Sequence, residues 1–141
     1  MSDLEKAKEE LQRGGYTCVL SKNDDFAVCS ARGVRPLVAW FEEGNCFQGY
    51  SAAERVVGKA TAFLYVLLGI KAVYAHVMSK GAHAILCSHG ITAEYQQLAE
   101  NIINRSGDGI CPFEAAVISC SNAKGAYLLI RTQIERMGIR I

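Results

Sequence analysis

The chain has 141 residues, of which 50% are hydrophobic and 21% are charged. This length is enough for one domain with a substantial core but short for two, so we expect a single domain over residues 1–141. Fifteen basic and fourteen acidic residues give a net charge of +1. No basic cluster stands out, which argues against a nucleic-acid partner. The longest apolar run is about half of the roughly 20 residues that a membrane span needs, which argues against a membrane partner.

The six cysteines form no CxxC pair and no dense framework of the disulfide-rich kind. The N-terminal stretch MSDLEKAKEELQRGG is charged where a secretory signal peptide would be apolar. We therefore expect a reduced, cytoplasmic protein.

The first half of the chain predicts a helix, a hairpin and a second, longer helix. Ser2 can cap the first helix, which carries apolar residues at helical spacing and ends at Gly14-Gly15. Two β-rich runs joined around residues 23–25 predict an antiparallel hairpin, extended by a third segment after the Gly33/Pro36 break. A glycine-rich loop over Glu43 to Ser51 then leads into a long apolar helix predicted from Ala52 to Leu68.

The second half predicts alternating strands and helices. The run Lys71 to Ser79 is typical of a strand buried on both faces, and Ser79 can cap the following helix, which ends at Gly90. TAEYQQLA fits a further strand, and an irregular segment follows it. Two more helices are predicted, one opening at CPFEAAVIS and one, capped by Asn122, from about Ala123 to Met137.

Four short segments carry a family resemblance: VVGKATAF, VMSK, the NR of INR, and GDGICPFEAAV. Together they resemble the markers of a small, functionally uncharacterised family of bacterial and archaeal proteins, catalogued as a domain of unknown function. The resemblance covers roughly residues 3 to 138. It implies a cytidine deaminase-like fold: a three-layer α-β-α domain of the α/β class, with a mixed sheet of about five strands.

The zinc signatures of the deaminases are missing from this chain. Such enzymes open one helix with an HxE-type motif and the next with PCxxC, so that metal, water and proton shuttle meet. Here Gly58-Lys59-Ala60 stands at the first position, and at the second only His83 could replace a ligand. One ligand of three does not hold zinc, so we expect no metal and no other cofactor. Metal-activated deamination is the activity that this departure puts most in doubt.

Lys59 stands at the start of an apolar helix, where the partial positive charge of the N-terminus disfavours an ammonium group unless an anion lies nearby. If the resemblance holds, the helices near Lys59 and Ser79 aim their N–H groups into one cleft, and Lys80 adds charge. Such a cleft suits a phosphate or carboxylate. Two other interpretations stay open: Lys59 can extend to solvent with its stem packed on Val56 and Phe63, or act as a base or nucleophile with a lowered pKa.

Cys111 and Glu114 form the second candidate site. A thiol at a helix N-terminus has a lowered pKa, and Glu114 one turn along could act as its base. Alternatively, Glu114 only folds back onto the free N–H groups of its own helix, as capping glutamates do.

Two further groups complete the candidates. Asn104 and Arg105 lie in the loop before Cys111, where the arginine could clamp a phosphate or pair with Asp108. His83 and Cys87 are one turn apart on a helix, which suits a metal but equally suits ordinary packing.

The leading hypothesis is a small-molecule site without deaminase zinc, which binds an anionic, nucleotide-like ligand through Lys59, Ser79, Lys80 and Arg105. Gly58 and Asn104 would border this site, and Cys111 and Glu114 would line it. One alternative is a metal-free enzyme that uses Cys111 or Lys59 as nucleophile or base. A second is a non-catalytic interaction module. The high apolar content also allows self-association, at no particular surface.

Overall fold

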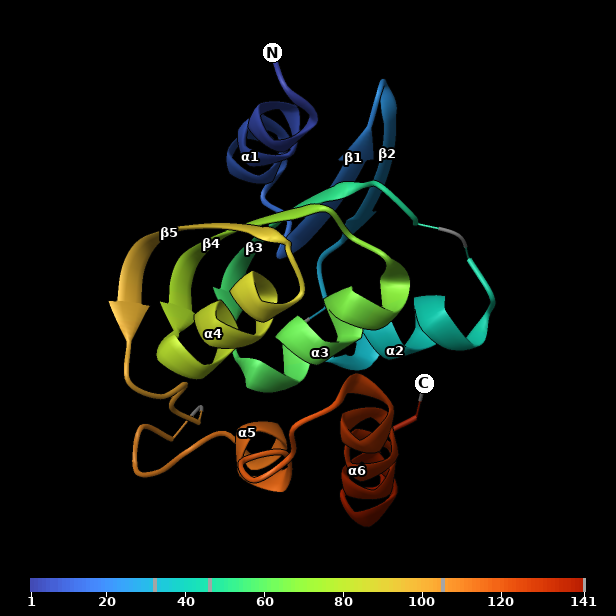
Figure 1. Cartoon of the computed structure of the whole chain (residues 1–141). Coiled ribbons are helices and arrows are strands. Elements are labelled where there is room, and N and C mark those ends of the chain that lie inside the picture. The colour runs from blue at the N-terminus through green and yellow to red at the C-terminus, as the bar shows by residue number, and fades with distance from the viewer. Residues whose placement is uncertain (32, 46, 105, 141) are drawn as a thin grey trace.

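A five-stranded mixed sheet runs through the middle of the molecule, with helices on both faces (Figure 1). The structure is a computed structural model that describes all residues except Arg32, Cys46, Arg105 and Ile141. The strands are β1 (Cys18–Lys22), β2 (Asp25–Cys29), β3 (Ser51–Val57), β4 (Ala72–Ser79) and β5 (Thr92–Ala99). The helices are α1 (Asp3–Gly14), α2 (Arg35–Glu42), α3 (Lys59–Leu68), α4 (Lys80–Ser88), α5 (Pro112–Ala116) and α6 (Ala123–Arg136).

The strand order across the sheet is β2-β1-β3-β4-β5. β1 pairs antiparallel with both β2 and β3, whereas β3, β4 and β5 pair parallel. The predicted three-layer α/β fold with about five strands is therefore confirmed. Among the described residues, no helix is long and apolar enough to cross a membrane.

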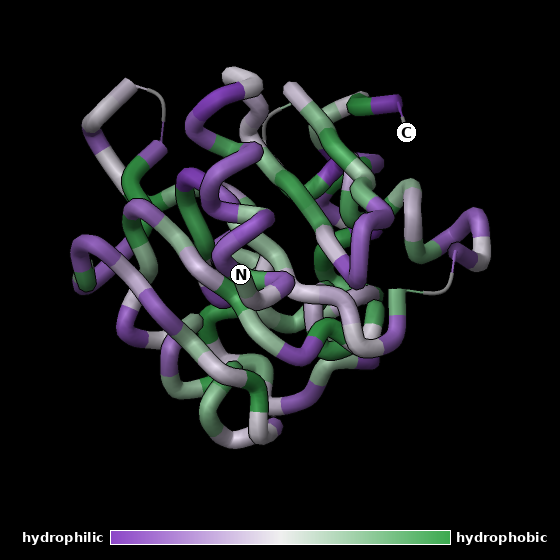
Figure 2. The backbone as a smooth tube through the Cα atoms, turned by 90° about the horizontal axis from the view of Figure 1, so that it is seen from above, coloured by the Kyte–Doolittle hydropathy of each residue, from purple (hydrophilic) through white to green (hydrophobic). Residues whose placement is uncertain are grey.

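The two faces of the sheet are covered unequally. Among the described helices, only α1 covers one face, where Leu4, Ala7 and Leu11 pack against strand residues such as Val19 and Tyr74. Its outer surface is largely hydrophilic, as the view from above shows (Figure 2). The main core lies on the other face, between the sheet and α2, α3 and α4, and α5 and α6 pack beneath these helices (Figure 1).

Several predicted elements are present as expected. Ser2 caps α1 by accepting a hydrogen bond from the Glu5 N–H, and Gly15 ends that helix with a left-handed φ of 69°. Ser79 caps α4 and Asn122 caps α6 in the same way. The hairpin β1–β2, the buried strand β4 and the strand β5 also match their predicted segments.

Two predicted elements are wrong. The third extended segment after Pro36 is the helix α2, because proline fits the first turn of a helix and Leu37 and Val38 face the core. The long helix predicted from Ala52 is divided: residues Ser51–Val57 form the central strand β3, and α3 begins only at Lys59. A strand buried on both faces lacks the alternation of polar and apolar residues that would distinguish it from a buried helix.

Candidate functional site

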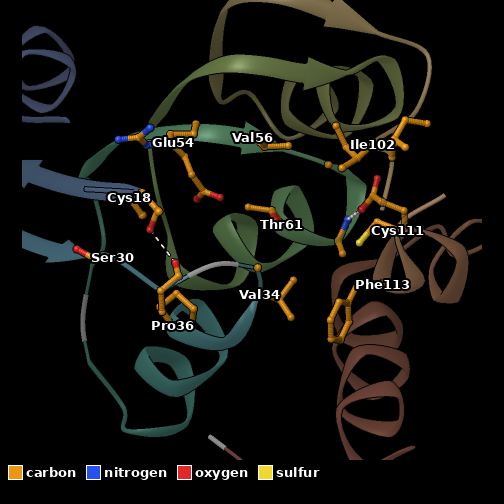
Figure 3. A pocket seen from close by; sticks show the side chains of 18 of the residues that line it. Cys18, Ser30, Val34, Pro36, Glu54, Val56, Thr61, Ile102, Cys111 and Phe113 are labelled. Atoms are coloured by element: carbon orange, nitrogen blue, oxygen red, sulfur yellow. Dashed lines mark hydrogen bonds between the residues drawn. The ribbon is translucent and has the colours of Figure 1, made fainter. Parts of the chain in front are cut away.

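A cavity of about 580 Å³ lies between the sheet, the start of α3, and the segments before α2 and α5. Its size falls within the range of small-molecule sites, roughly 300–1,000 Å³. Figure 3 shows Glu54 reaching from β3 into this space, with Val34 and Pro36 on one side and Cys111 and Phe113 on another. The cavity thus combines apolar walls with two carboxyl groups, those of Glu54 and Glu114.

Glu54 belongs to a buried cluster of three polar side chains. Its Oε1 accepts a hydrogen bond from the hydroxyl of Tyr65 on α3, and the same hydroxyl lies 3.3 Å from the Sγ of Cys18 on β1. Glu54 is 8% exposed, Cys18 2% and Tyr65 0%. Within the part of the chain that the structure describes, no lysine or arginine forms an ion pair with Glu54.

Burial raises the pKa of Glu54 to about 7, and the hydrogen bonds from Tyr65 and Cys18 only partly oppose this shift. Burial also raises the pKa values of Cys18 and Tyr65 well above their ordinary values, so both stay protonated. Glu54 is therefore the group of this cluster that changes its charge near neutral pH. A carboxyl group of this kind in a cavity is a candidate for ligand recognition or proton transfer.

The sequence interpretation missed Glu54 because it placed this residue in the first turn of a helix, where an acidic residue is ordinary. In the strand β3, Glu54 instead sits between β1 and β4, opposite Cys18 and Ala75. The available signal was the run SAA directly before Glu54, whose residues are small enough for a buried strand.

Glu114 of α5 extends its side chain to the N-terminus of α3. Its two carboxylate oxygens accept hydrogen bonds from the backbone N–H groups of Lys59 and Ala60, at 2.7 and 2.8 Å. Gly58 makes this approach possible, because a Cβ atom there would lie 2.4 Å from the carboxyl carbon of Glu114. Glu114 was predicted to serve Cys111 or its own helix. In the structure, the carboxylate of Glu114 instead contacts the N-terminus of α3, a different helix, where its negative charge balances the helix dipole.

Because the Glu114 carboxylate lies at the N-terminus of α3, the positive charge of Lys59 needs no bound anion there. Its ammonium group donates a hydrogen bond to the Ile118 carbonyl at 2.9 Å and lies 5.9 Å from the centre of the Phe63 ring. Lys59 lines a second cavity of about 180 Å³, together with Ser79, Glu100 and Glu114. Gly58 lines the larger cavity instead. Gly58 and Lys59, both predicted to bind the ligand, thus line two different cavities, with Glu114 on the border of both.

The other predicted ligand-binding residues have partners within the chain. The Ser79 hydroxyl accepts from the Ala82 N–H at 3.0 Å, and Lys80 forms an ion pair with Glu100. Asn104 donates to Asp108 at 2.9 Å in its loop. Arg105 lies outside the described residues.

Cys111 precedes α5 and lines the larger cavity as a half-buried residue. It shares the cavity with Glu114, but the Glu114 carboxylate is engaged by α3. Cys111 therefore lies where a bound molecule would contact it. Among the residues that the structure describes, none is assigned to it as a base.

His83 and Cys87 do lie together on α4, with Sγ 3.7 Å from Nε2. His83 also stacks edge-on against Tyr95 of β5. Among the described residues, no group of three or more histidine, cysteine, aspartate or glutamate side chains is arranged to hold a metal ion.

Comparison with known proteins identifies a family but no activity. The family model for TM1506, a domain of unknown function (DUF1893), matches residues 6–134. The crystal structure of a DUF1893 family protein (TM1506) from Thermotoga maritima is similar, with a TM-score of 0.83 and 20% sequence identity. That match covers 96% of this chain and 91% of the other, and at this identity it shows the fold alone. No curated protein matches the chain.

Proposed function

The chain belongs to the DUF1893 family, whose function is unknown, and we propose that its larger cavity binds a small, nucleoside-like molecule. The observation that carries this proposal is the Glu54 carboxyl group, which is buried in a cavity of ligand size with no basic partner among the described residues. Burying a carboxyl group costs stability unless a partner compensates it, and the hydrogen bonds from Tyr65 and Cys18 only partly oppose the effect of burial on Glu54. A bound molecule supplies such a partner.

The hydrogen bonding of Glu54 indicates the chemical class. One oxygen already accepts from Tyr65, and Cys18 also bonds to the carboxyl group, so we infer that a ligand contacts the oxygen that Tyr65 does not use. When ionised, it accepts from an N–H group; when protonated, it donates to a ring nitrogen. Because the pKa of Glu54 is about 7, both forms exist near neutral pH. A flat nitrogen heterocycle between apolar walls such as Val34 and Phe113 fits this arrangement.

The nucleoside-like character is also supported by the resemblance to cytidine deaminase-like proteins, which itself stays a prediction. The sequence also predicted that the ligand carries an anionic group, which would bind at the start of α3. The N–H groups of Lys59 and Ala60 already bind the Glu114 carboxylate, so a ligand phosphate would have to displace it. We therefore place the base and sugar, rather than a phosphate, at the centre of the proposal.

The test is a thermal-shift series with adenosine, cytidine and their monophosphates on the wild type and three variants. Glu54→Gln removes the ionisable group at nearly constant shape, and Val56→Trp fills the cavity from a side chain that is 42% exposed. Glu135→Gln is the matched control, because Glu135 is exposed on α6. We expect a nucleoside to raise the Tm of the wild type and the control, and to raise it less in the other two variants.

The proposal fails if none of these compounds shifts the wild-type Tm at millimolar concentration. It also fails if the shift is the same in all variants. A shift by the monophosphates alone would instead favour the anion site at the start of α3.

A second candidate function, a metal-free enzyme, is favoured by the position of Cys111 on the wall of the same cavity. Iodoacetamide labelling across pH tests it, since an activated thiol reacts below the ordinary thiol pKa. Labelling that follows an ordinary thiol pKa would contradict a nucleophilic role. Lys59 as base or nucleophile is a further hypothesis, and so is a non-catalytic interaction module.

A further inference from the structure

The strand β5 forms one edge of the sheet, and its outer side has no partner strand within the described chain. It pairs with β4 along its whole length of eight residues, from Thr92 to Ala99. In Figure 1 it is the outermost strand, with no other element beyond it. Alternate N–H and C=O groups along the outer side of β5 are therefore available for pairing with another chain.

Edge strands in soluble proteins usually carry features that block such pairing, such as lysine, proline or a short length. The sequence of β5, TAEYQQLA, contains neither lysine nor proline, and Glu94 is its only charged residue. The opposite edge, β2, is shorter, with five residues. The two edges thus differ, and only β5 combines length with low charge.

We propose that β5 pairs antiparallel with β5 of a second copy of this chain, around a two-fold axis at Tyr95. We take a second copy as the occupant because the side chains of β5 can pair with those of an identical strand without bringing like charges together. In a regular antiparallel ladder, two opposite residues either both direct their N–H and C=O groups toward the other strand or both direct them away. A residue of β5 must therefore lie opposite the same residue of the second copy, with the two-fold axis between them.

The choice of Tyr95 follows from the side chains. With the axis there, Tyr95 faces the partner's Tyr95, and Glu94 faces the partner's Gln96. With the axis at Glu94, two glutamates would face each other, which is destabilising. Cross-strand aromatic pairs are favourable, and Tyr95 is 42% exposed at this edge while its ring already packs on His83.

The resulting dimer has a continuous sheet of ten strands, five from each copy. Pairing around Tyr95 extends from Thr92 to Leu98 and gives about six to eight hydrogen bonds between the two strands. Because the two-fold axis is perpendicular to the sheet, α4 and the partner's α4 lie on the same face of this sheet. The interface lies away from the larger cavity, so this inference does not depend on the proposed ligand.

The test begins with the mass of the full chain in solution by size-exclusion chromatography with light scattering, over a range of concentrations. We expect a dimer, and we expect Tyr95→Lys to convert it to a monomer because two ammonium groups would then meet at the axis. Val28→Lys, on the β2 edge, is the control and is expected to stay dimeric; Val28 is 41% exposed. A monomeric wild type, or a dimer that survives Tyr95→Lys, would overturn the proposal.

A cross-linking experiment covers the case in which Tyr95→Lys fails to fold. In a Cys87→Ser background, which removes the one exposed thiol among the described residues, Tyr95→Cys is expected to form an intermolecular disulfide under mild oxidation. Gln97→Cys is the matched control, because Gln97 would face the partner's Ala93 and lie far from the partner's Gln97. Cross-linking of both variants to the same extent, or of neither, would contradict the two-fold axis at Tyr95.

Discussion

Glu54 couples the stability of this protein to pH near neutrality. Its pKa is about 7 in the folded state, against an ordinary value of 4.5 in the unfolded chain, so the folded state holds the proton more tightly. The stabilising contribution is fully present below about pH 4.5 and is lost as pH rises through 7. The ionised form is the one that burial disfavours, and Glu54 therefore destabilises the fold in alkaline solution.

We expect Glu54→Gln to remove this dependence. A pKa difference of this size corresponds to about 3 kcal/mol of unfolding free energy between acidic and mildly alkaline pH. Urea unfolding of the wild type and the variant at several pH values measures it. The difference in stability between variant and wild type should shift in favour of the variant as pH rises from about 5 to about 8. A constant difference would show that Glu54 has an ordinary pKa.

Glu114 is the second residue with a measurable effect of its own. Glu114→Ala leaves the N–H groups of Lys59 and Ala60 without their acceptor, which should cost about 1–3 kcal/mol. Phosphate or sulfate should restore part of this loss, because the vacated helix N-terminus then binds the anion. Denaturant unfolding with and without sulfate measures both effects.

The control for this experiment is Glu135→Ala, since Glu135 is exposed near the end of α6. Sulfate also stabilises proteins generally, so the relevant quantity is the additional gain in Glu114→Ala over the control. Equal gains in both variants would mean that α3 offers no anion site when Glu114 is removed.

At the scale of elements, the junction of β3 and α3 depends on Gly58. In Gly58→Ala the new Cβ atom would meet the Glu114 carboxyl group at 2.4 Å, so the carboxylate must move away from α3. We expect a loss of stability similar to that of Glu114→Ala, and less than additive losses in the double variant. A double-mutant cycle from denaturant unfolding measures this coupling.

Gly81→Ala is the matched control, because it places a Cβ atom in the first turn of the neighbouring helix α4. Its nearest contact would be 3.7 Å from Lys59, an ordinary van der Waals distance. The alanine should be tolerated there, and helix propensity favours it over glycine. Additive losses for Gly58→Ala and Glu114→Ala would contradict the direct contact between these two residues.

The elements also show why one part of the site was predictable and another was not. Ser79 could be located from the sequence, since a capping residue marks the start of its helix locally. The start of α3 could not, because the predicted helix from Ala52 to Leu68 contained Gly58 and Lys59. Glu54 could not, because the run from Ala52 to Val57 has the composition of either a helix or a central strand. Only its pairing with β1 and β4 decides between them.

At the scale of the whole molecule, the alternation of strands and helices and the three-layer α/β class were predictable from periodicity and the family resemblance. The partner of Glu114 was not, because its contact with Lys59 spans 55 residues of chain and lies in no local pattern. The same holds for the cavity, which joins β1, β3 and the segment before α5. The geometry of the site thus depends on contacts between residues far apart in the sequence, which local patterns do not reveal.

The measurement that tests the central claim most directly is a titration of isotope-labelled protein with adenosine or cytidine, followed by backbone amide NMR. If the larger cavity binds such a molecule, the amide signals that shift should belong to residues around Cys18, Glu54, Thr61 and Cys111. Shifts confined to the second cavity, near Ser79 and Gly81, would contradict the account. So would the absence of any shift with either compound at millimolar concentration.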